Sequence, residues 1–416
     1  MKKMVEKNKL VNYNPIIAVI FIIIIFYIGL AAMFPSILFN IGYFVKNENK
    51  AILEVINKID IEYRNMLDFK GNPLINKGAF INLNGLMARV MGQRYMNDRV
   101  KLDNGHLTYL LPQQDVTRAV IQLTKLYNAQ KENRKHFLFV LVPYQVPKYE
   151  NIFPVGYEDY GNQNADNLIH ILNEHAIPVL DLRDEMIKDG INNTDAFFKT
   201  DHHWTPETGF WAHTKIINYF IQAGIIDDIE PKYTDINEYN VETLKNWFLG
   251  SNGKRTGSYY AGVDDFSIIT PKFKTDISLE IPLYNIFKSG SFADVIFHDL
   301  NKIYEKNYFT ENPYGNYGYG DNTGKIYINK QAPIDLKILS IRDSFACVTT
   351  TFLPIVIKKC YELDFRQNNN TGGFEDKNSF KNFYLELNPD IILVLINPSN
   401  ISSANTTYDF FNDLKE

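Results

Sequence analysis

The chain of 416 residues is 45% hydrophobic, 14% aromatic and 22% charged. This is a globular composition, and it excludes a disordered or collagen-like chain. With 43 Lys and Arg against 48 Asp and Glu, the net charge is -5, so no basic excess indicates a nucleic-acid partner. The two cysteines, Cys347 and Cys360, are too few for a disulfide scaffold or a zinc site built on thiolates, and we expect both to be buried thiols.

The N-terminal segment predicts the compartment. No charged residue lies between Leu10 and Val45, and Ile16–Phe34 is almost wholly apolar. Its 19 residues would span roughly 28 Å as a helix, about the thickness of one bilayer core. Glu6 is the one acidic residue before this run, among four lysines: Lys2, Lys3, Lys7 and Lys9. This flank predicts a cytosolic N-terminus and an exported remainder.

We therefore predict a single-pass signal anchor in the cell membrane within residues 1–45. Residues 46–416 then form one extracellular or periplasmic domain. The alternative is a cleaved signal peptide, because Gly29-Leu30-Ala31-Ala32 offers small residues to a peptidase.

Helices and buried strands alternate along the first half of the exported part. Amphipathic helices are predicted near 49–66, 115–130 and 164–175. Apolar runs at Phe137–Val142 and Ile177–Leu182 have the length and flanks of buried strands. This order predicts a mainly parallel sheet with helices on both faces, a three-layer α/β/α architecture.

A change of composition marks residues 227–330, which are rich in Gly, Asn and Tyr. We interpret this stretch as β hairpins and long loops inserted into the sheet domain. The α/β pattern then resumes with predicted strands at 336–341, 361–365 and 390–396, and with a helix at 345–359 broken at Pro354. The run Ile391–Ile396 is apolar enough to be a central strand.

The first chemical motif is Asp201-His202-His203-Trp204, which precedes a predicted helix with Thr205 as N-cap. In an extended stretch, residues i and i+2 point the same way. Asp201 would then hold one ring nitrogen of His203 and leave the other nitrogen free as a base. His202 and Trp204 would face the opposite side.

The second motif is Ser344, which follows an apolar strand at the point where a helix is predicted to begin. Backbone N–H groups at such a turn can stabilise the oxyanion of an acyl-transfer intermediate. With Asp201 and His203, Ser344 makes a candidate Asp–His–Ser triad. A plain N-cap role for Asp343-Ser344 is the structural alternative.

These motifs resemble the bacterial DHHW protein family and the SGNH-type domains of accessory proteins for alginate and other exopolysaccharide O-acetylation. The likeness extends over roughly residues 70–400. Its blocks include Phe198-Lys-Thr-Asp-His-His-Trp-Thr-Pro, Phe248-Leu-Gly-Ser and Ile341-Arg-Asp-Ser-Phe-Ala, with weaker ones at 254–257, 319–321, 363–366 and 388–393. It implies an SGNH-hydrolase-like fold and a triad of Ser344, His203 and Asp201. The implied activity is O-acyl transfer, most simply of acetyl, or ester hydrolysis on a cell-envelope polysaccharide, without a cofactor. The implied partner is a multispanning membrane-bound O-acyltransferase.

Weaker candidates surround this triad. Backbone amides at Phe345, Gly250 and Gly320 are candidate oxyanion donors. Arg366 would contact substrate or make a surface ion pair, and Tyr319 belongs to a Tyr/Gly-rich loop that is either a tight turn or a sugar platform. Arg342 stands where the resemblance predicts glycine, and its side chain either lines the cleft or points away from it.

Three other interpretations stay open. Asp201, His202, His203 and His213 could bind a metal, although their spacing fits no metal-site pattern and we predict none. A non-catalytic polysaccharide-binding or scaffold subunit would use the tyrosine-rich loops as its working surface. A free esterase would turn over soluble acetyl esters without a partner.

Overall fold

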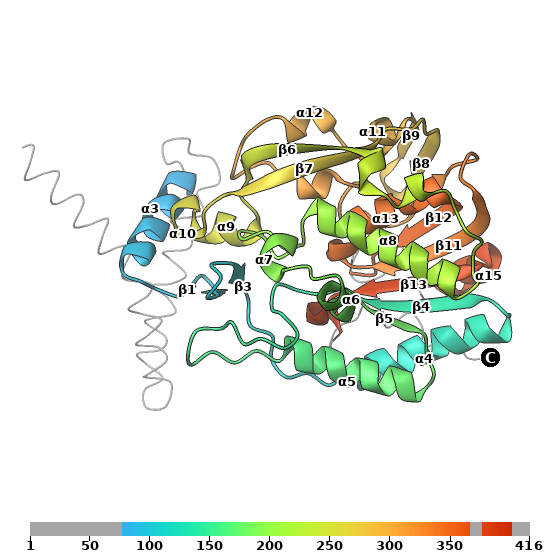
Figure 1. Ribbon diagram of the computed structural model, residues 1–416, viewed down its shortest axis with the longest axis horizontal. Helices are drawn as coiled ribbons and strands as arrows, with labels where there is room; N and C mark the ends of the chain where they lie inside the picture. Colours follow the sequence, from blue (N-terminus) through green and yellow to red (C-terminus); the bar gives the residue numbers. More distant parts are fainter. Residues whose placement is uncertain (1–76, 367–376, 402–416) are drawn as a thin grey trace, which may run out of the picture. The chain divides into compact units, whose positions relative to one another are not determined.

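The computed structural model describes residues 77–366 and 377–401 (Figure 1). The predicted anchor, the predicted helix at 49–66 and the domain boundary after residue 45 lie outside these residues. Within the described ranges, no helix combines the length and hydropathy needed to cross a membrane. The chain divides after Phe80 into two units. Of the first unit only residues 77–80 are described, so the fold below is that of the second.

A sheet of eight strands, in the order β5-β4-β13-β11-β12-β10-β8-β9, is the centre of the second unit. Its first five strands are mutually parallel. They are β5 (Val179–Asp181), β4 (His136–Leu141), β13 (Ile391–Ile396), β11 (Ile334–Arg342) and β12 (Ile357–Leu363). The predicted α/β architecture with a mainly parallel sheet is thereby confirmed, and Ile391–Ile396 is central as expected.

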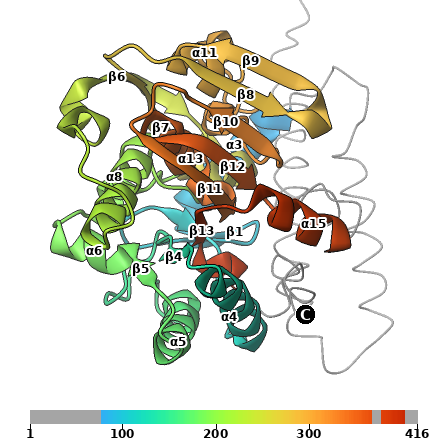
Figure 2. The same ribbon diagram turned by 90° about the vertical axis from the view of Figure 1, so that its right-hand side faces the viewer.

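Side chains on the two faces of this sheet enter two separate hydrophobic cores, because residues alternate along a strand. On β4, Leu138 and Val140 enter one core, while Phe137, Phe139 and Leu141 enter the other. The first core is covered by α6 (Leu182–Lys188), α8 (Pro206–Gln222) and α13 (Cys347–Thr351). The second is covered by α4 (Thr117–Glu132), α5 (Gly161–Glu174) and α15 (Lys377–Leu387). Figure 2 shows the helices on both sides of the sheet, which gives three layers.

The stretch 227–330 does contain the predicted hairpins, but part of it continues the main sheet. Strands β8 (Ile277–Ile281) and β9 (Ile286–Gly290) form a hairpin, and β10 (Lys325–Ile328) joins β8 to β12, all antiparallel. Strands β6 (Tyr239–Phe248) and β7 (Asp264–Pro271) form a separate two-stranded sheet. The alternating apolar residues of β8 reach the first core, which explains why these strands extend the sheet.

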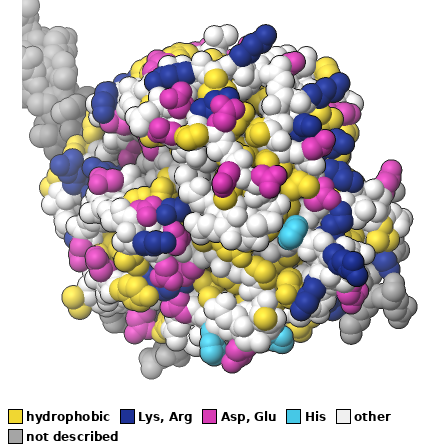
Figure 3. Space-filling model, turned by 45° about the vertical axis from the view of Figure 1, so that its right-hand side comes forward, with side chains coloured by type: hydrophobic (Ala, Val, Ile, Leu, Met, Phe, Trp, Pro, Cys, Tyr) yellow, Lys and Arg dark blue, Asp and Glu magenta, His cyan; other side chains and the backbone are white. Residues whose placement is uncertain are grey.

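Smaller elements complete the second unit. Near its start are the part of α3 (Lys77–Val90) that follows Phe80 and a three-stranded sheet of β1 (Tyr95–Met96), β2 (Arg99–Lys101) and β3 (Leu107–Thr108). The remaining short helices are α7 (Asn193–Ala196), α9 (Ser251–Thr256), α10 (Ser258–Ala261), α11 (Phe292–Ile296), α12 (Leu300–Ile303) and α14 (Leu353–Val356). On the face shown in Figure 3, basic and acidic side chains are interspersed.

Candidate active site

The loop before α8 is held in place from three directions. Gln145, just beyond β4, donates its side-chain amide to the carbonyl oxygens of Phe198 (2.8 Å) and Asp201 (2.6 Å). Asp264 of β7 accepts hydrogen bonds from the backbone N–H and the hydroxyl of Thr200 at 2.8 and 2.6 Å. Thr205 caps α8 as predicted, with its side chain accepting from the N–H of Thr208. Residues 198–205 are therefore fixed although they are irregular.

Asp201 and His203 form the predicted pair. The Nδ1 of His203 lies 2.5 Å from Oδ1 of Asp201, which also accepts the backbone N–H of His203 at 3.0 Å. The second carboxylate oxygen, Oδ2, accepts the N–H of Ser251 at 2.5 Å. Burial acts to raise the pKa of Asp201, but electrostatic interaction with the adjacent His202 and His203 rings, together with the hydrogen bonds from His203 and Ser251, holds it well below its usual range. Asp201 is thus an ionised group that fixes the His203 ring.

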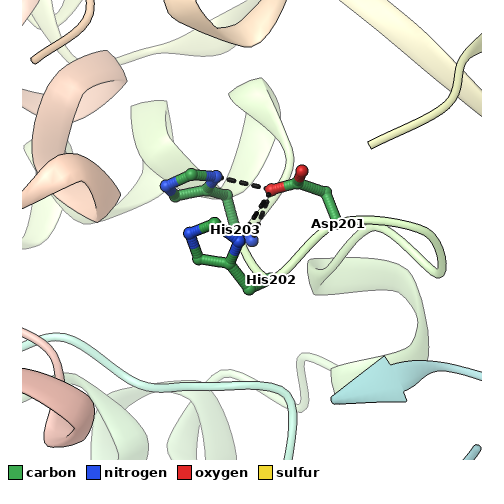
Figure 4. A group of neighbouring side chains, drawn as sticks. All are labelled: Asp201, His202 and His203. Carbon is green, nitrogen blue, oxygen red and sulfur yellow. Dashed lines mark hydrogen bonds and ion pairs between the residues drawn. The ribbon is translucent and has the colours of Figure 1, made fainter. Parts of the chain in front are cut away.

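The expectation that His202 faces the opposite side is wrong. Its ring lies against that of His203, with centroids 3.8 Å apart, and both rings point toward Asp201 (Figure 4). The physical reason is local: residues 201–203 form bends rather than extended backbone, so the i, i+2 alternation does not apply. His202 bonds through Nδ1 to the hydroxyl of Ser251 at 2.9 Å. Burial lowers the pKa of His202 to about 3, so it is neutral at physiological pH.

Two aromatic rings enclose His203. Tyr314 stacks on the imidazole at 4.2 Å with an interplanar angle of 13°, and the ring of Phe345 lies 4.9 Å away. The Tyr314 hydroxyl donates to the carbonyl oxygen of Phe345 at 2.8 Å, which ties the imidazole to the turn that carries Ser344. The Nε2 of His203 is buried and has no hydrogen-bond partner among the described residues. The sequence indicated Tyr314 only as the first residue of the Tyr/Gly-rich loop, and its contact with His203 was missed because the two residues are remote along the chain.

Ser344 lies at the strand-to-helix turn after β11, as predicted, and is 8% exposed. The helix that follows is shorter than expected: a 3₁₀ turn (Ser344–Ala346) and α13 replace the predicted helix at 345–359, and β12 already begins at Ile357. Asp343 is the N-cap, accepting from the N–H of Phe345 at 3.0 Å. The Asp343 carboxylate also accepts from the backbone N–H of Asn397 at 2.8 Å, which ties the turn to the end of β13.

The candidate oxyanion amides are already engaged. The N–H of Phe345 donates to Asp343, that of Gly250 to the hydroxyl of Thr200, and that of Gly320 to the carbonyl of Tyr317. None of the three is therefore free to bind an oxyanion in this structure. Gly250 instead lets the backbone lie directly against Asp201, because a Cβ at this position would lie 2.2 Å from the Cβ of Asp201.

Tyr319 is buried, and Arg366 makes the ion pair that was the alternative prediction. The Tyr319 ring is 5% exposed and packs on His298, so the loop is a tight turn rather than a sugar platform. Arg366 is ion-paired: its Nη2 lies 2.6 Å from Asp364 and 3.5 Å from Asp321.

Arg342 is fully buried and does not line a cleft. Its guanidinium donates to Glu362 at 2.6 and 3.0 Å, to Asp364 at 3.1 Å and to the carbonyl oxygen of Gly320 at 2.7 Å. Arg342 therefore organises the loop beside the site rather than the reacting atoms. Cys347 and Cys360 are free and buried. Burial raises the pKa of Cys347 to about 12, so this thiol is not a competing nucleophile.

Asp201, His202 and His203 are the described residues whose ligand atoms are close enough to share a metal ion, all within 4.8 Å of one another. His213, on α8, is not part of this group. Both carboxylate oxygens of Asp201 already accept hydrogen bonds within the site. The contacts therefore fit a carboxylate that orients a histidine.

An SGNH-like α/β domain with an Asp–His pair beside a strand-end serine is the class that this fold and site define. Residues 107–237 match the family model described as "SGNH hydrolase-like domain, acetyltransferase AlgX". The resemblance predicted from the sequence is thereby confirmed. The matched segment contains Asp201 and His203, whereas Ser344 lies beyond it. No curated protein matches the sequence.

Solved structures are similar over most of the chain. PatB1 of Bacillus cereus with a sulfonyl adduct has a TM-score of 0.61 and 18% identity, covering 77% of this chain and 98% of that one. A DHHW family protein from Eubacterium siraeum has a TM-score of 0.54 and 15% identity, covering 76% and 95%. At such identities the likeness establishes the fold.

Proposed function

We propose that the protein is an O-acyltransferase or esterase that uses Ser344, His203 and Asp201 to move an acyl group, most simply acetyl, to or from a cell-envelope polysaccharide. The observation that carries the proposal is the state of His203. Asp201 fixes its Nδ1, Tyr314 holds its ring, and its Nε2 is left without a partner next to the Ser344 turn. The match to an acetyltransferase family model supports the same chemistry.

The reaction would proceed in two steps. Ser344 Oγ attacks the acyl carbonyl carbon and transfers its proton to Nε2 of His203, while Asp201 stabilises the resulting imidazolium. The tetrahedral intermediate collapses as His203 returns the proton to the leaving oxygen, which leaves an acyl-serine. A sugar hydroxyl or water then attacks this ester, with His203 acting again as base and then acid. No cofactor takes part.

The hydrogen bond between Ser344 and His203 would form during this cycle. Such bonds are often long or misaligned without substrate and tighten in the reacting complex. The oxyanion donor would be the backbone N–H of Ser344, because the other amides considered for this role are bound elsewhere.

The acyl donor and the location belong to the same proposal. An acyl group carried across the membrane by a multispanning O-acyltransferase would be passed to Ser344, and the domain would face outward from a single N-terminal anchor. The uncharged run Ile16–Phe34 after four lysines supports this arrangement.

A scaffold subunit is the second candidate, favoured by the missing hydrogen bond between Nε2 of His203 and Ser344. Turnover of a soluble acetyl ester by the purified full-length chain separates the two functions. Removing Ser344 or His203 alone should abolish turnover about as fully as removing both, because the residues act as a unit. Asp201→Asn should lower kcat roughly 10⁴-fold, because asparagine would favour the wrong tautomer of the His203 imidazole.

The control for this series is His202. We expect His202→Ala to retain most of the turnover, since this ring is bonded to Ser251 and is not the predicted base. Full turnover by His203→Ala, with loss in His202→Ala, would contradict the assignment of the base.

A further inference from the structure

Helix α3 has two apolar faces, and only one of them is packed. The packed face contains Gly85 and Ala88. A Cβ on Gly85 would lie 2.2 Å from the carbonyl oxygen of Thr256, and Ala88 belongs to a small core with Tyr260. This face accounts for the docking of α3 on α9 and α10.

The other face follows the spacing i, i+3, i+4, i+7, which defines one stripe of a helix. Its members are Leu83, Leu86, Met87 and Val90. Leu83 is 42% exposed, Leu86 40% and Val90 79%, and Met91 just after the helix is 51% exposed. Met87 of this stripe is half-buried, and the other three members are exposed, so most of the stripe lies outside the packing that holds the helix on the domain.

Basic residues surround the C-terminal end of the same helix. Segments 81–105 and 251–262 together contain six basic and two acidic side chains, in a chain whose net charge is -5. One of the acidic residues, Asp103, is paired with Arg94 at 2.6 Å. Arg89 and Arg255 are exposed. Burial together with the positive charges of Arg89 and Arg94 lowers the pKa of Lys101, which places these three charges near one another.

We propose that the stripe Leu83, Leu86, Met87 and Val90 lies in the headgroup region of a lipid bilayer, with the basic residues around it contacting anionic lipid. An exposed apolar stripe flanked by Lys and Arg is the pattern of helices that bind in the plane of the membrane interface. The local positive charge, opposite in sign to that of the whole chain, favours an anionic membrane over an apolar protein groove. The inference goes beyond the proposed acyl transfer and does not depend on it.

The test measures depth with a fluorescent label on single introduced cysteines. The two native cysteines are buried, so Leu86→Cys and Val90→Cys can be labelled selectively in the folded full-length chain. Leu283→Cys is the matched control, since this leucine is 47% exposed on a different part of the domain. Each labelled chain is reconstituted with vesicles of neutral lipid, or of neutral lipid with one-third phosphatidylglycerol. Quenching by a lipid-borne nitroxide is compared with quenching by aqueous iodide.

With anionic vesicles, we expect labels at 86 and 90 to be quenched about threefold more by the nitroxide than by iodide, and the label at 283 to show the reverse. The double substitution Arg89→Gln with Arg255→Gln, or high salt, should reduce this preference. Equal iodide quenching at 86, 90 and 283 would overturn the proposal. Protection of the labels at 86 and 90 from both quenchers would also overturn it, because it would indicate that protein covers the stripe. So would nitroxide quenching in neutral vesicles equal to that in anionic vesicles.

Discussion

Gly250 lies against Asp201 so closely that a side chain at this position would displace the carboxylate. The nearest atoms to a Cβ built on Gly250 are the Cβ of Asp201 at 2.2 Å and its Oδ2 at 2.5 Å. The backbone of Gly250 has φ -72° and ψ -176°, a conformation open to alanine. Any effect of a substitution here is therefore steric and acts directly on the group that orients His203.

Gly250→Ala should accordingly lower kcat/KM for an acetyl ester by about 10²-fold, the cost of misplacing a catalytic group by about 1 Å. Cooperative thermal unfolding would show that the domain is intact. The matched control is Ser251→Ala, which keeps the backbone N–H to Asp201 and loses only the hydroxyl bonded to His202. It should stay within a few-fold of the wild type. Unchanged activity in Gly250→Ala would remove Asp201 from the mechanism.

At the scale of elements, strands β10, β11 and β12 share a buried charge cluster beside the site. Lys325 of β10 and Arg342 of β11 both pair with Glu362 of β12, at 2.5 and 2.6 Å, and both cations donate to the carbonyl oxygen of Gly320. Burial acts to raise the pKa of Glu362, but Arg342 and Lys325 lower it to about 2. The cluster joins the parallel part of the sheet to its antiparallel extension.

Glu362→Gln should destabilise the fold by about 3–5 kcal/mol at pH 7, because the buried Lys325 loses its paired carboxylate and Arg342 keeps Asp364 but loses Glu362. The ordinary pKa of Glu362 is 4.5, so its contribution to stability is complete above that pH and is lost as the pH falls toward 2. The free energy of unfolding, measured with denaturant between pH 7 and pH 3, should fall less on acidification in Glu362→Gln than in the wild type. Glu280→Gln, on the exposed side of β8, is the control and should change stability by about 0.5 kcal/mol or less. A Glu362→Gln variant as stable as the wild type would contradict the account.

The same elements show what the sequence could and could not predict. Strands β4 and β13 and helix α8 were predicted closely, because continuous apolar runs and the Thr205 cap are local signals. The early start of β12 was missed, since its pairing with β11 and β10 depends on contacts distant along the chain. Asp201 and His203 were paired correctly, whereas Tyr314 and the contacts of Gly250 depend on tertiary packing. His202 was misplaced because the alternation rule was applied to a bend.

For the whole molecule, the proposed topology places everything after Val45 outside the cytosol. Alkaline phosphatase fused after Glu416 should then be active, while a reporter that folds only in the cytosol should stay dark at the same point. The opposite pair of results would reverse the orientation of the anchor. Lys-to-Glu changes within the four-lysine flank are the control, because they should weaken the cytosolic retention of the N-terminus.

The central claim is that Ser344 is a nucleophile activated by His203. The most direct measurement is the mass of the full-length protein, and of its Ser344 peptide, after treatment with a sulfonyl fluoride. The predicted result is a single adduct on Ser344 that is absent in Ser344→Ala and greatly slowed in His203→Ala. An unlabelled Ser344 in a folded chain, or labelling that is unchanged by His203→Ala, would contradict it.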